Sequence, residues 1–187
     1  MNTVKEVLSD LETKMKKTVE AFHREFNTVR TGRASAAIVE GIKVEYYGQE
    51  ISLRQIANIS IPDAKLIVIQ PWDPQLLSEI EKAILASDIG ITPTNDGKVV
   101  RLNVPALTQE RREELVKLVR KMAEDGRISL RSARHVANET IDKLEKEKKI
   151  SEDEKFKTHK DTQKLIEKYT EEIDKLLKLK EEEITSH

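Results

Sequence analysis

The sequence contains no cysteine, and it also lacks any long apolar run. The absence of cysteine excludes disulfide bonds, thiolate metal sites and a cysteine nucleophile. No stretch reaches the roughly 18 apolar residues that a membrane-spanning helix needs, and residues 1–17 lack the apolar core of a signal peptide. We therefore expect a soluble, cytoplasmic protein that does not enter a membrane.

Residue patterns typical of enzymes are also missing. The four histidines are far apart, and none has a second histidine at the spacing of a helical metal motif. No glycine-rich loop resembles a phosphate cradle, and Ser35 lacks the G-x-S-x-G setting of a hydrolase nucleophile. Carboxylates alternate with lysines, as in residues 145–148, which is typical of a solvated helix face. The sequence therefore predicts no catalytic residue, no metal site and no cofactor.

Proline and glycine are scarce and confined to one part of the chain. All five prolines and five of the six glycines fall between Gly32 and Pro105. Because these residues interrupt helices and mark turns, the chain divides into a helical start, a turn-rich middle and a long helical remainder. We predict a discontinuous helical domain, residues 1–30 plus 106–187, interrupted by an inserted domain, residues 31–105.

Apolar residues recur at steps of three and four in three segments, which predicts amphipathic helices over 1–30, 106–149 and 152–185. Ser151 and Glu154 form an S-x-x-E capping box at the start of the last helix. None of these helices can bury its apolar face alone, so a three-helix bundle is expected. A membrane-surface role fits less well, because the polar faces mix both charge signs.

The inserted segment has the pattern of a small β/α/β domain of about 75 residues. Its expected elements are strands over 42–46, 56–61 and 66–69, turns at Gly48-Gln49 and Pro62-Asp63, a helix opened by Asp73-Pro74, and a hairpin turn at 95–97 before a strand over 99–104. The two chain crossings, 29–33 and 103–106, must lie side by side if the first two helices pack together. Gly32 and Pro105 favour a hinge there, and an ordinary rigid junction is the alternative.

The formal net charge of -1 argues at first against a nucleic-acid partner. The charge is unevenly distributed, however. Residues 106–150 carry 12 basic and 9 acidic side chains, whereas residues 151–187 carry 8 and 11. Within 111–134, basic residues exceed acidic ones by four. A basic second helix is thus followed by an acidic third.

Four arginines of the second helix, Arg120, Arg127, Arg131 and Arg134, fall with Asn138 within about 60° of one another on a helical projection, away from the apolar stripe. We call these four side chains the arginine row. A guanidinium group suits bidentate contact with phosphate. The row is therefore interpreted as facing RNA or a protein partner. In the alternative, it pairs with carboxylates of the acidic third helix.

Several stretches resemble bacterial ribosome recycling factor, in the same order and over essentially the whole chain. They are Val29-Arg30-Thr31-Gly32-Arg33-Ala34-Ser35, Gly41-Ile42-Lys43-Val44-Glu45-Tyr46-Tyr47-Gly48, Leu53-Arg54-Gln55-Ile56-Ala57, Glu81-Lys82-Ala83-Ile84, Ala86-Ser87-Asp88-Ile89-Gly90, Leu107-Thr108-Gln109-Glu110-Arg111-Arg112, and Arg127 through Arg131 with Arg134, Ala137 and Asn138.

The resemblance implies an α+β two-domain, L-shaped protein, in which a long three-helix bundle carries an inserted small β/α/β domain. It also implies a monomeric, non-catalytic factor that disassembles the post-termination ribosome complex together with elongation factor G and GTP. Its expected partners are the 70S ribosome and the 23S rRNA of the large subunit. The ribosomes would then leave the messenger RNA for a new round of translation.

The resemblance also assigns residues to roles. The expected rRNA-binding residues are Arg111, Arg112, Arg120, Arg127, Arg131, Arg134 and Asn138. The expected hinge residues are Val29, Arg30, Thr31, Gly32, Arg33, Asn103, Val104, Pro105 and Ala106. His135 stands where many members of the family carry another arginine. A coiled-coil-like interaction adaptor or chaperone is the competing function class, and a hydrolase is a distant third.

Overall fold

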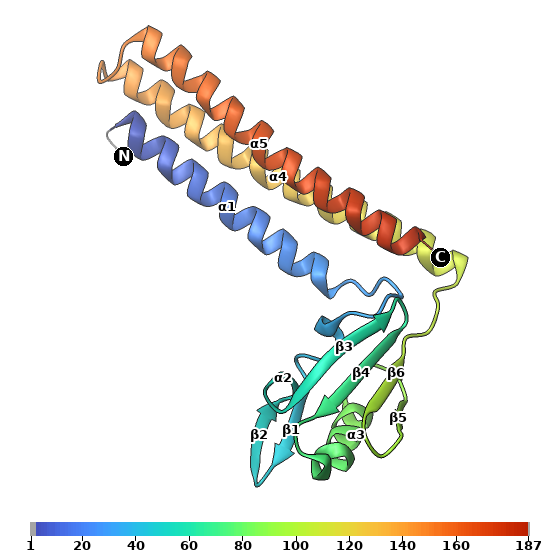
Figure 1. Cartoon of the computed structure of the whole chain (residues 1–187). Helices are drawn as coiled ribbons and strands as arrows, with labels where there is room; N and C mark the ends of the chain where they lie inside the picture. Colours follow the sequence, from blue (N-terminus) through green and yellow to red (C-terminus); the bar gives the residue numbers. More distant parts are fainter. Residues whose placement is uncertain (1–2, 187) are drawn as a thin grey trace. The chain divides into compact units, whose positions relative to one another are not determined.

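The structure is a computed structural model that describes residues 3–186. It separates into two compact units, which we call the helical unit and the sheet unit (Figure 1). The sheet unit spans Arg30–Gln109, and the helical unit holds the three long helices. The elements in chain order are α1 (Val4–Thr28), η1 (Ala36–Ile38), β1 (Lys43–Tyr46), β2 (Gln49–Ser52), α2 (Leu53–Ile56), β3 (Ala57–Asp63), β4 (Leu66–Pro71), η2 (Pro74–Leu76), α3 (Leu77–Ala86), β5 (Pro93–Asn95), β6 (Val100–Asn103), α4 (Gln109–Lys146) and α5 (Glu152–Thr185).

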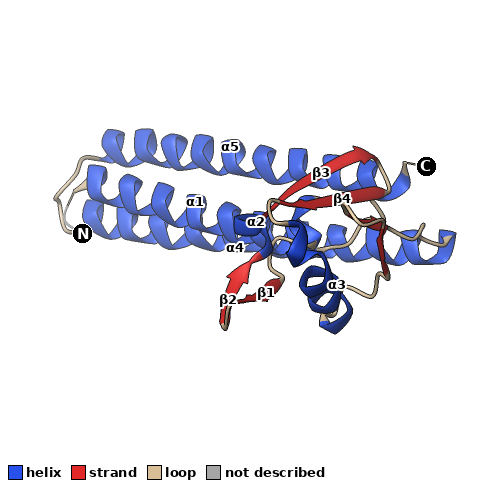
Figure 2. Ribbon diagram, turned by 60° about the horizontal axis from the view of Figure 1, so that its bottom comes forward, coloured by secondary structure: helices blue, strands red, loops and turns tan. Residues whose placement is uncertain are grey.

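In the helical unit, α1, α4 and α5 run alongside one another (Figures 1 and 2). At 38 residues, α4 has a length of about 57 Å. The side chains that α1 buries follow the predicted steps of three and four, and they are Val7, Leu11, Met15, Val19, Phe22 and Phe26. At the start of α5, the Ser151 hydroxyl accepts a hydrogen bond from the Glu154 backbone N–H, while the Glu154 carboxylate accepts one from the Ser151 N–H. The predicted capping box is thus confirmed.

The apolar pattern of the second helix predicts that Leu115, Leu118, Met122, Ala133, Ala137 and Leu144 are buried, and this is correct only in part. Leu115, Ala137 and Leu144 are buried, whereas Leu118 is 45% exposed and Met122 and Ala133 are half-buried. The buried residues of α4 are Leu115, Val119, Ala123, Gly126, Leu130, Ala137, Ile141 and Leu144. Because α4 packs against both α1 and α5, it buries the side chains that face the space between these two helices. Small residues such as Gly126 fill that space where a neighbouring helix comes close. A Cβ atom added at Gly126 would lie 3.0 Å from Ile173 Cδ1.

The sheet unit contains a four-stranded antiparallel sheet in the order β3-β4-β6-β5 and a separate hairpin, β1-β2. Helix α3 packs against β1, β5 and β6, and it buries Leu77, Ile80 and Ile84. The core also takes fully buried side chains from both sheets and the connections, among them Val44, Leu53, Ile67, Ile69, Val100 and Leu102. The unit therefore has a hydrophobic core of its own.

Three predictions for this unit were wrong in detail. The turn between β1 and β2 lies at Tyr47-Gly48, because Gln49 already begins β2. The turn between β3 and β4 lies at Ala64-Lys65, because Pro62 and Asp63 continue β3. Proline is tolerated there since β3 is an edge strand, and the Asp63 carboxylate closes the turn by accepting from the Lys65 backbone N–H at 2.8 Å. Ile56, expected to begin a strand, ends α2 instead, and β3 begins at Ala57.

The predicted helix start at Asp73 and the predicted hairpin turn at residues 95–97 are confirmed. The Asp73 carboxylate caps η2 by accepting from the Gln75 backbone N–H at 2.9 Å, and α3 follows directly. Between β5 and β6, Gly97 has a φ of +85° and donates its N–H to the Asn95 side chain. Over residues 3–186, no helix combines the length and the apolar character that crossing a membrane requires.

Candidate nucleic-acid interface

The arginine row lies along the side of α4 that meets α5. Its members differ in how far their charge is already neutralised. Arg120 Nε lies 2.5 Å from Glu181 Oε1 on α5, and Arg127 donates from Nε and Nη2 to Asp174 Oδ1 at 2.9 and 2.5 Å. These hydrogen bonds raise the pKa of both guanidinium groups. For Arg120 and Arg127, the alternative that the row pairs with the third helix is confirmed.

Arg131 pairs within its own helix. Its Nη2 lies 2.6 Å from Glu124 Oε1, and the other oxygen of that carboxylate lies 3.2 Å from Arg127 Nη1. The two arginines lower the pKa of Glu124, with the hydrogen bond from Arg131 as the larger cause. The Arg131 side chain is 51% exposed, and its Nε and Nη1 have no hydrogen-bond partner among residues 3–186. Arg131 is therefore only partly engaged.

Arg134 has no acidic partner within the described part of the chain. Its Nη1 donates to the side-chain oxygen of Gln163 on α5, and this glutamine carries no charge. The Gln163 amide nitrogen donates in turn to Glu167 at 2.8 Å. Arg134 is thus oriented by a hydrogen bond while its positive charge is left uncompensated.

Asn138 lies where α4 contacts α5. Its side-chain oxygen accepts a hydrogen bond at 2.8 Å from the hydroxyl of Thr162, which is fully buried. The same hydroxyl lies 2.9 Å from the carbonyl of His159. Asn138 is half-buried, and the structure gives its side-chain oxygen a role in satisfying a buried polar group.

The remaining basic residues named from the sequence lie at the start of α4. Arg111 is exposed and donates from Nη1 to Glu114 at 2.7 Å, whereas Arg112 is half-buried. Arg111 and Arg120 are nine residues apart, or about 13 Å along the helix. His135 is 74% exposed, and its Nε2 lies 3.3 Å from Glu139. The structure joins Arg127 and Arg131 through the shared carboxylate of Glu124, whereas Arg120 forms a separate ion pair with Glu181.

Both crossings at the edge of the sheet unit are fastened to it. Arg30 Nη1 donates to the Ile89 carbonyl at 2.6 Å, and its Nη2 donates to the Asp88 carbonyl at 3.2 Å. Gly32 has a φ of +75°, and a Cβ atom there would lie 2.8 Å from Cγ of Leu107, the residue that follows the second crossing. The first crossing therefore packs against the chain just after the second.

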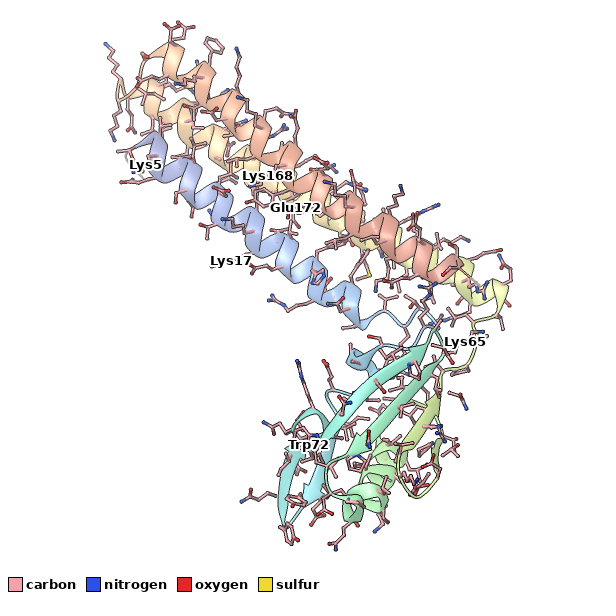
Figure 3. All side chains as sticks on the ribbon, in the orientation of Figure 1. Lys5, Lys17, Lys65, Trp72, Lys168 and Glu172 are labelled. Atoms are coloured by element: carbon pink, nitrogen blue, oxygen red, sulfur yellow. The ribbon has the colours of Figure 1, made fainter. Side chains whose placement is uncertain are left out.

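The Ala64-Lys65 turn, which the sequence pattern did not mark, is hydrogen-bonded to the second crossing and to the residue that follows the first. Ala34 donates its backbone N–H to the carbonyl of Ala64, and Val104 donates its own to the carbonyl of Lys65, both at 2.8 Å. Lys65 lies at one end of β4 and Trp72 at the other (Figure 3). In the sequence, the only indication of the Ala64-Lys65 turn was the turn predicted two residues earlier, at Pro62-Asp63. Within residues 3–186, no group of three or more His, Asp or Glu side chains is arranged to hold a metal ion.

Comparison with known proteins gives a consistent result. Residues 22–185 match the family described as ribosome recycling factor. The ribosome-recycling factor of Carboxydothermus hydrogenoformans is 51% identical over 183 residues, covering 98% of this chain and 99% of the relative. That of Heliobacterium modesticaldum is 52% identical over 181 residues, covering 97% and 98%.

Two solved structures are similar over nearly the full length. A solution structure of the ribosome recycling factor has a TM-score of 0.80 and 44% identity, and the match covers 98% of each chain. The second describes the T. thermophilus ribosome recycling factor and the E. coli elongation factor G bound to the E. coli post-termination complex. It has a TM-score of 0.69 and 41% identity and covers 97% of this chain and 98% of the matched chain.

Proposed function

Since this chain belongs to the ribosome recycling factor family, we propose that it disassembles the post-termination ribosome complex together with elongation factor G and GTP. The family comprises translation factors that catalyse no reaction themselves. The solved structure that pairs a family member with elongation factor G on a post-termination complex supports these partners. The product of the process is a ribosome freed from messenger RNA.

The proposed contact with the ribosome is between the arginine row and phosphates of large-subunit 23S rRNA. The observation that carries it is the uncompensated charge at one end of the row, where Arg134 has a neutral partner and Arg131 keeps two nitrogens without a partner in the described chain. Phosphate oxygens are the acceptors that a guanidinium fork binds best. Arg120, paired with Glu181 on α5, and Arg127, paired with both Asp174 on α5 and Glu124, would contribute less to this contact.

The proposed mechanism needs the sheet unit to pivot, so that elongation factor G can push it while the bundle stays bound. The sequence places the hinge at residues 29–33 and 103–106. Hydrogen bonds within the sheet unit hold Arg30, Ala34 and Val104. Gly32 lies close against Leu107 of the same unit. We therefore propose that the backbone rotations of the pivot occur at Val29-Arg30 and at Pro105-Ala106, a smaller set of residues than the sequence predicts.

Co-sedimentation with purified large ribosomal subunits tests the binding step, and breakdown of polysomes with purified elongation factor G and GTP tests the complete function. We expect the double variant Arg131→Ala/Arg134→Ala to lose most of its subunit binding at low salt. Affinity of the unaltered protein should fall as salt rises, because phosphate contacts release counterions. Binding that neither salt nor the double variant affects would favour the competing class, a protein-interaction adaptor.

The pivot is tested by cross-linking the two crossings to the helical unit. The locked protein should still co-sediment with the large subunit but no longer break down polysomes. A locked protein with full recycling activity would reject the pivot and leave the rRNA contact unaffected.

A further inference from the structure

One carboxylate lies between two members of the arginine row. Glu124 Oε1 is 2.6 Å from Arg131 Nη2, and Glu124 Oε2 is 3.2 Å from Arg127 Nη1. All three residues are on α4, and Glu124 is 48% exposed, so the carboxylate lies at the same surface as the guanidinium groups that it joins. Glu124 thus engages two expected phosphate-binding side chains at once.

Arg127 is the member of the arginine row with the most hydrogen bonds to carboxylates. Its Nε and Nη2 both donate to Asp174, and Nη1, the remaining nitrogen, donates to Glu124. Its side chain is 24% exposed, the lowest value for any member of the row that forms an ion pair. Three of the five N–H groups of Arg127 therefore already donate to carboxylates, and a phosphate that approaches this guanidinium must compete with two negative charges.

The competition follows from the chemistry of the two anions. A carboxylate and a phosphate both accept hydrogen bonds from the edge of the guanidinium group, so they use the same donors. Glu124 also adds a negative charge within hydrogen-bonding distance of the cations, and this charge repels an approaching phosphate. Removing that charge while keeping an oxygen acceptor should strengthen binding to RNA and leave the arginines in place.

We propose that Glu124 is an intramolecular competitor of the RNA phosphates, which limits the affinity of the arginine row by occupying Arg131 and Arg127 in the free protein. This inference rests on the proposed rRNA contact. It assigns to one acidic residue the control of how strongly the factor holds, and therefore how readily it leaves, a phosphate surface.

The test is the variant Glu124→Gln, measured by filter binding to purified large ribosomal subunits at low salt. We expect its Kd to fall roughly threefold to tenfold, the effect of releasing two exposed ion pairs. The control is Glu147→Gln, which removes the same charge from a carboxylate that is also exposed and also paired, with Lys149 at 2.8 Å. Glu147 lies 23 residues from Glu124, about 35 Å along the helix direction and beyond the range of unscreened charge effects.

A double-mutant cycle shows whether Glu124 acts through its arginine. In an Arg131→Ala background, the gain from Glu124→Gln should shrink by at least half, because one of the two released cations is absent. The melting temperatures of all variants are measured alongside, and binding is compared where each is folded.

The outcomes separate the two proposals. If Glu124→Gln binds no more tightly than the unaltered protein, or if Glu147→Gln gains equally, Glu124 is not a competitor. If Arg131→Ala/Arg134→Ala binds as well as the unaltered protein, the rRNA contact itself is wrong. Loss of binding in that double variant without a gain in Glu124→Gln would reject only the competition.

Discussion

The hydroxyl of Tyr169 on α5 donates a hydrogen bond to Glu12 Oε1 on α1 at 3.0 Å, joining residues 157 positions apart. Tyr169 is 2% exposed, and burial together with this hydrogen bond raises its pKa to about 12. The same bond is the main cause of the lowered pKa of Glu12. The first and last helices are thus tied by a polar contact beside the core of the bundle.

This contact makes the bundle sensitive to high pH. A tyrosine pKa raised from 10.0 to about 12 adds stability that is complete below pH 10 and is lost as the pH rises through 12. Two pKa units correspond to about 2–3 kcal/mol. Urea unfolding followed by helical circular dichroism should show this decline in the unaltered protein and much less of it in Tyr169→Phe. Tyr47→Phe is the control, because Tyr47 is 84% exposed; an equal decline in Tyr169→Phe would contradict the assignment.

Members of the arginine row should differ when they are replaced singly by alanine. Arg134→Ala and Arg131→Ala should each weaken large-subunit binding by about tenfold, since a charge-assisted contact to phosphate is lost. Arg120→Ala should weaken it less and should lower the melting temperature of the bundle, because Arg120 is paired with Glu181. Filter binding and thermal unfolding measure the two effects. Equal binding losses at all three positions would mean that the α5 pairs break when RNA binds.

Asn138 is expected to act mainly through Thr162. Asn138→Ala removes an acceptor from a buried hydroxyl and should lower the free energy of unfolding by about 1 kcal/mol. The loss is limited because the same hydroxyl can donate to the His159 carbonyl. Subunit affinity and its salt dependence should not change. A smaller salt dependence in this variant would instead give Asn138 a direct contact with RNA.

Gly32 is required by the geometry of the crossings. Gly32→Ala should destabilise the sheet unit by about 1–2 kcal/mol, because alanine is strained at a φ of +75° and its Cβ would lie 2.8 Å from Leu107 Cγ. Gly41→Ala is the matched control, since a Cβ there meets nothing within 4 Å and no positive φ is required. Amide hydrogen exchange in β4 and β6 reports the stability of this unit alone. Equal exchange in both variants would show that the crossings tolerate the strain.

Local signals account for most of the fold. The steps of apolar residues, the Ser151–Glu154 capping box and the turns opened by Asp73 and Asn95 are interactions between residues close in sequence, and each is present in the structure. The turn at Ala64-Lys65 was predicted two residues too early, because Pro62, the residue taken to mark the turn, is accommodated on an edge strand. Whether a strand lies at an edge depends on the whole sheet, which no local pattern encodes.

By itself, the sequence determined the three amphipathic helices, the inserted β/α/β segment and a cluster of arginines on one side of the second long helix, because helical and strand periodicities are fixed by spacing along the chain. Only the tertiary structure decided which arginines have a carboxylate partner and which do not. Asp174 lies 47 residues from Arg127, and it reaches that guanidinium because α4 and α5 pack in one particular register. The same register places a neutral Gln163 beside Arg134, so the net charge of the chain gives no measure of the charge that this surface offers to RNA.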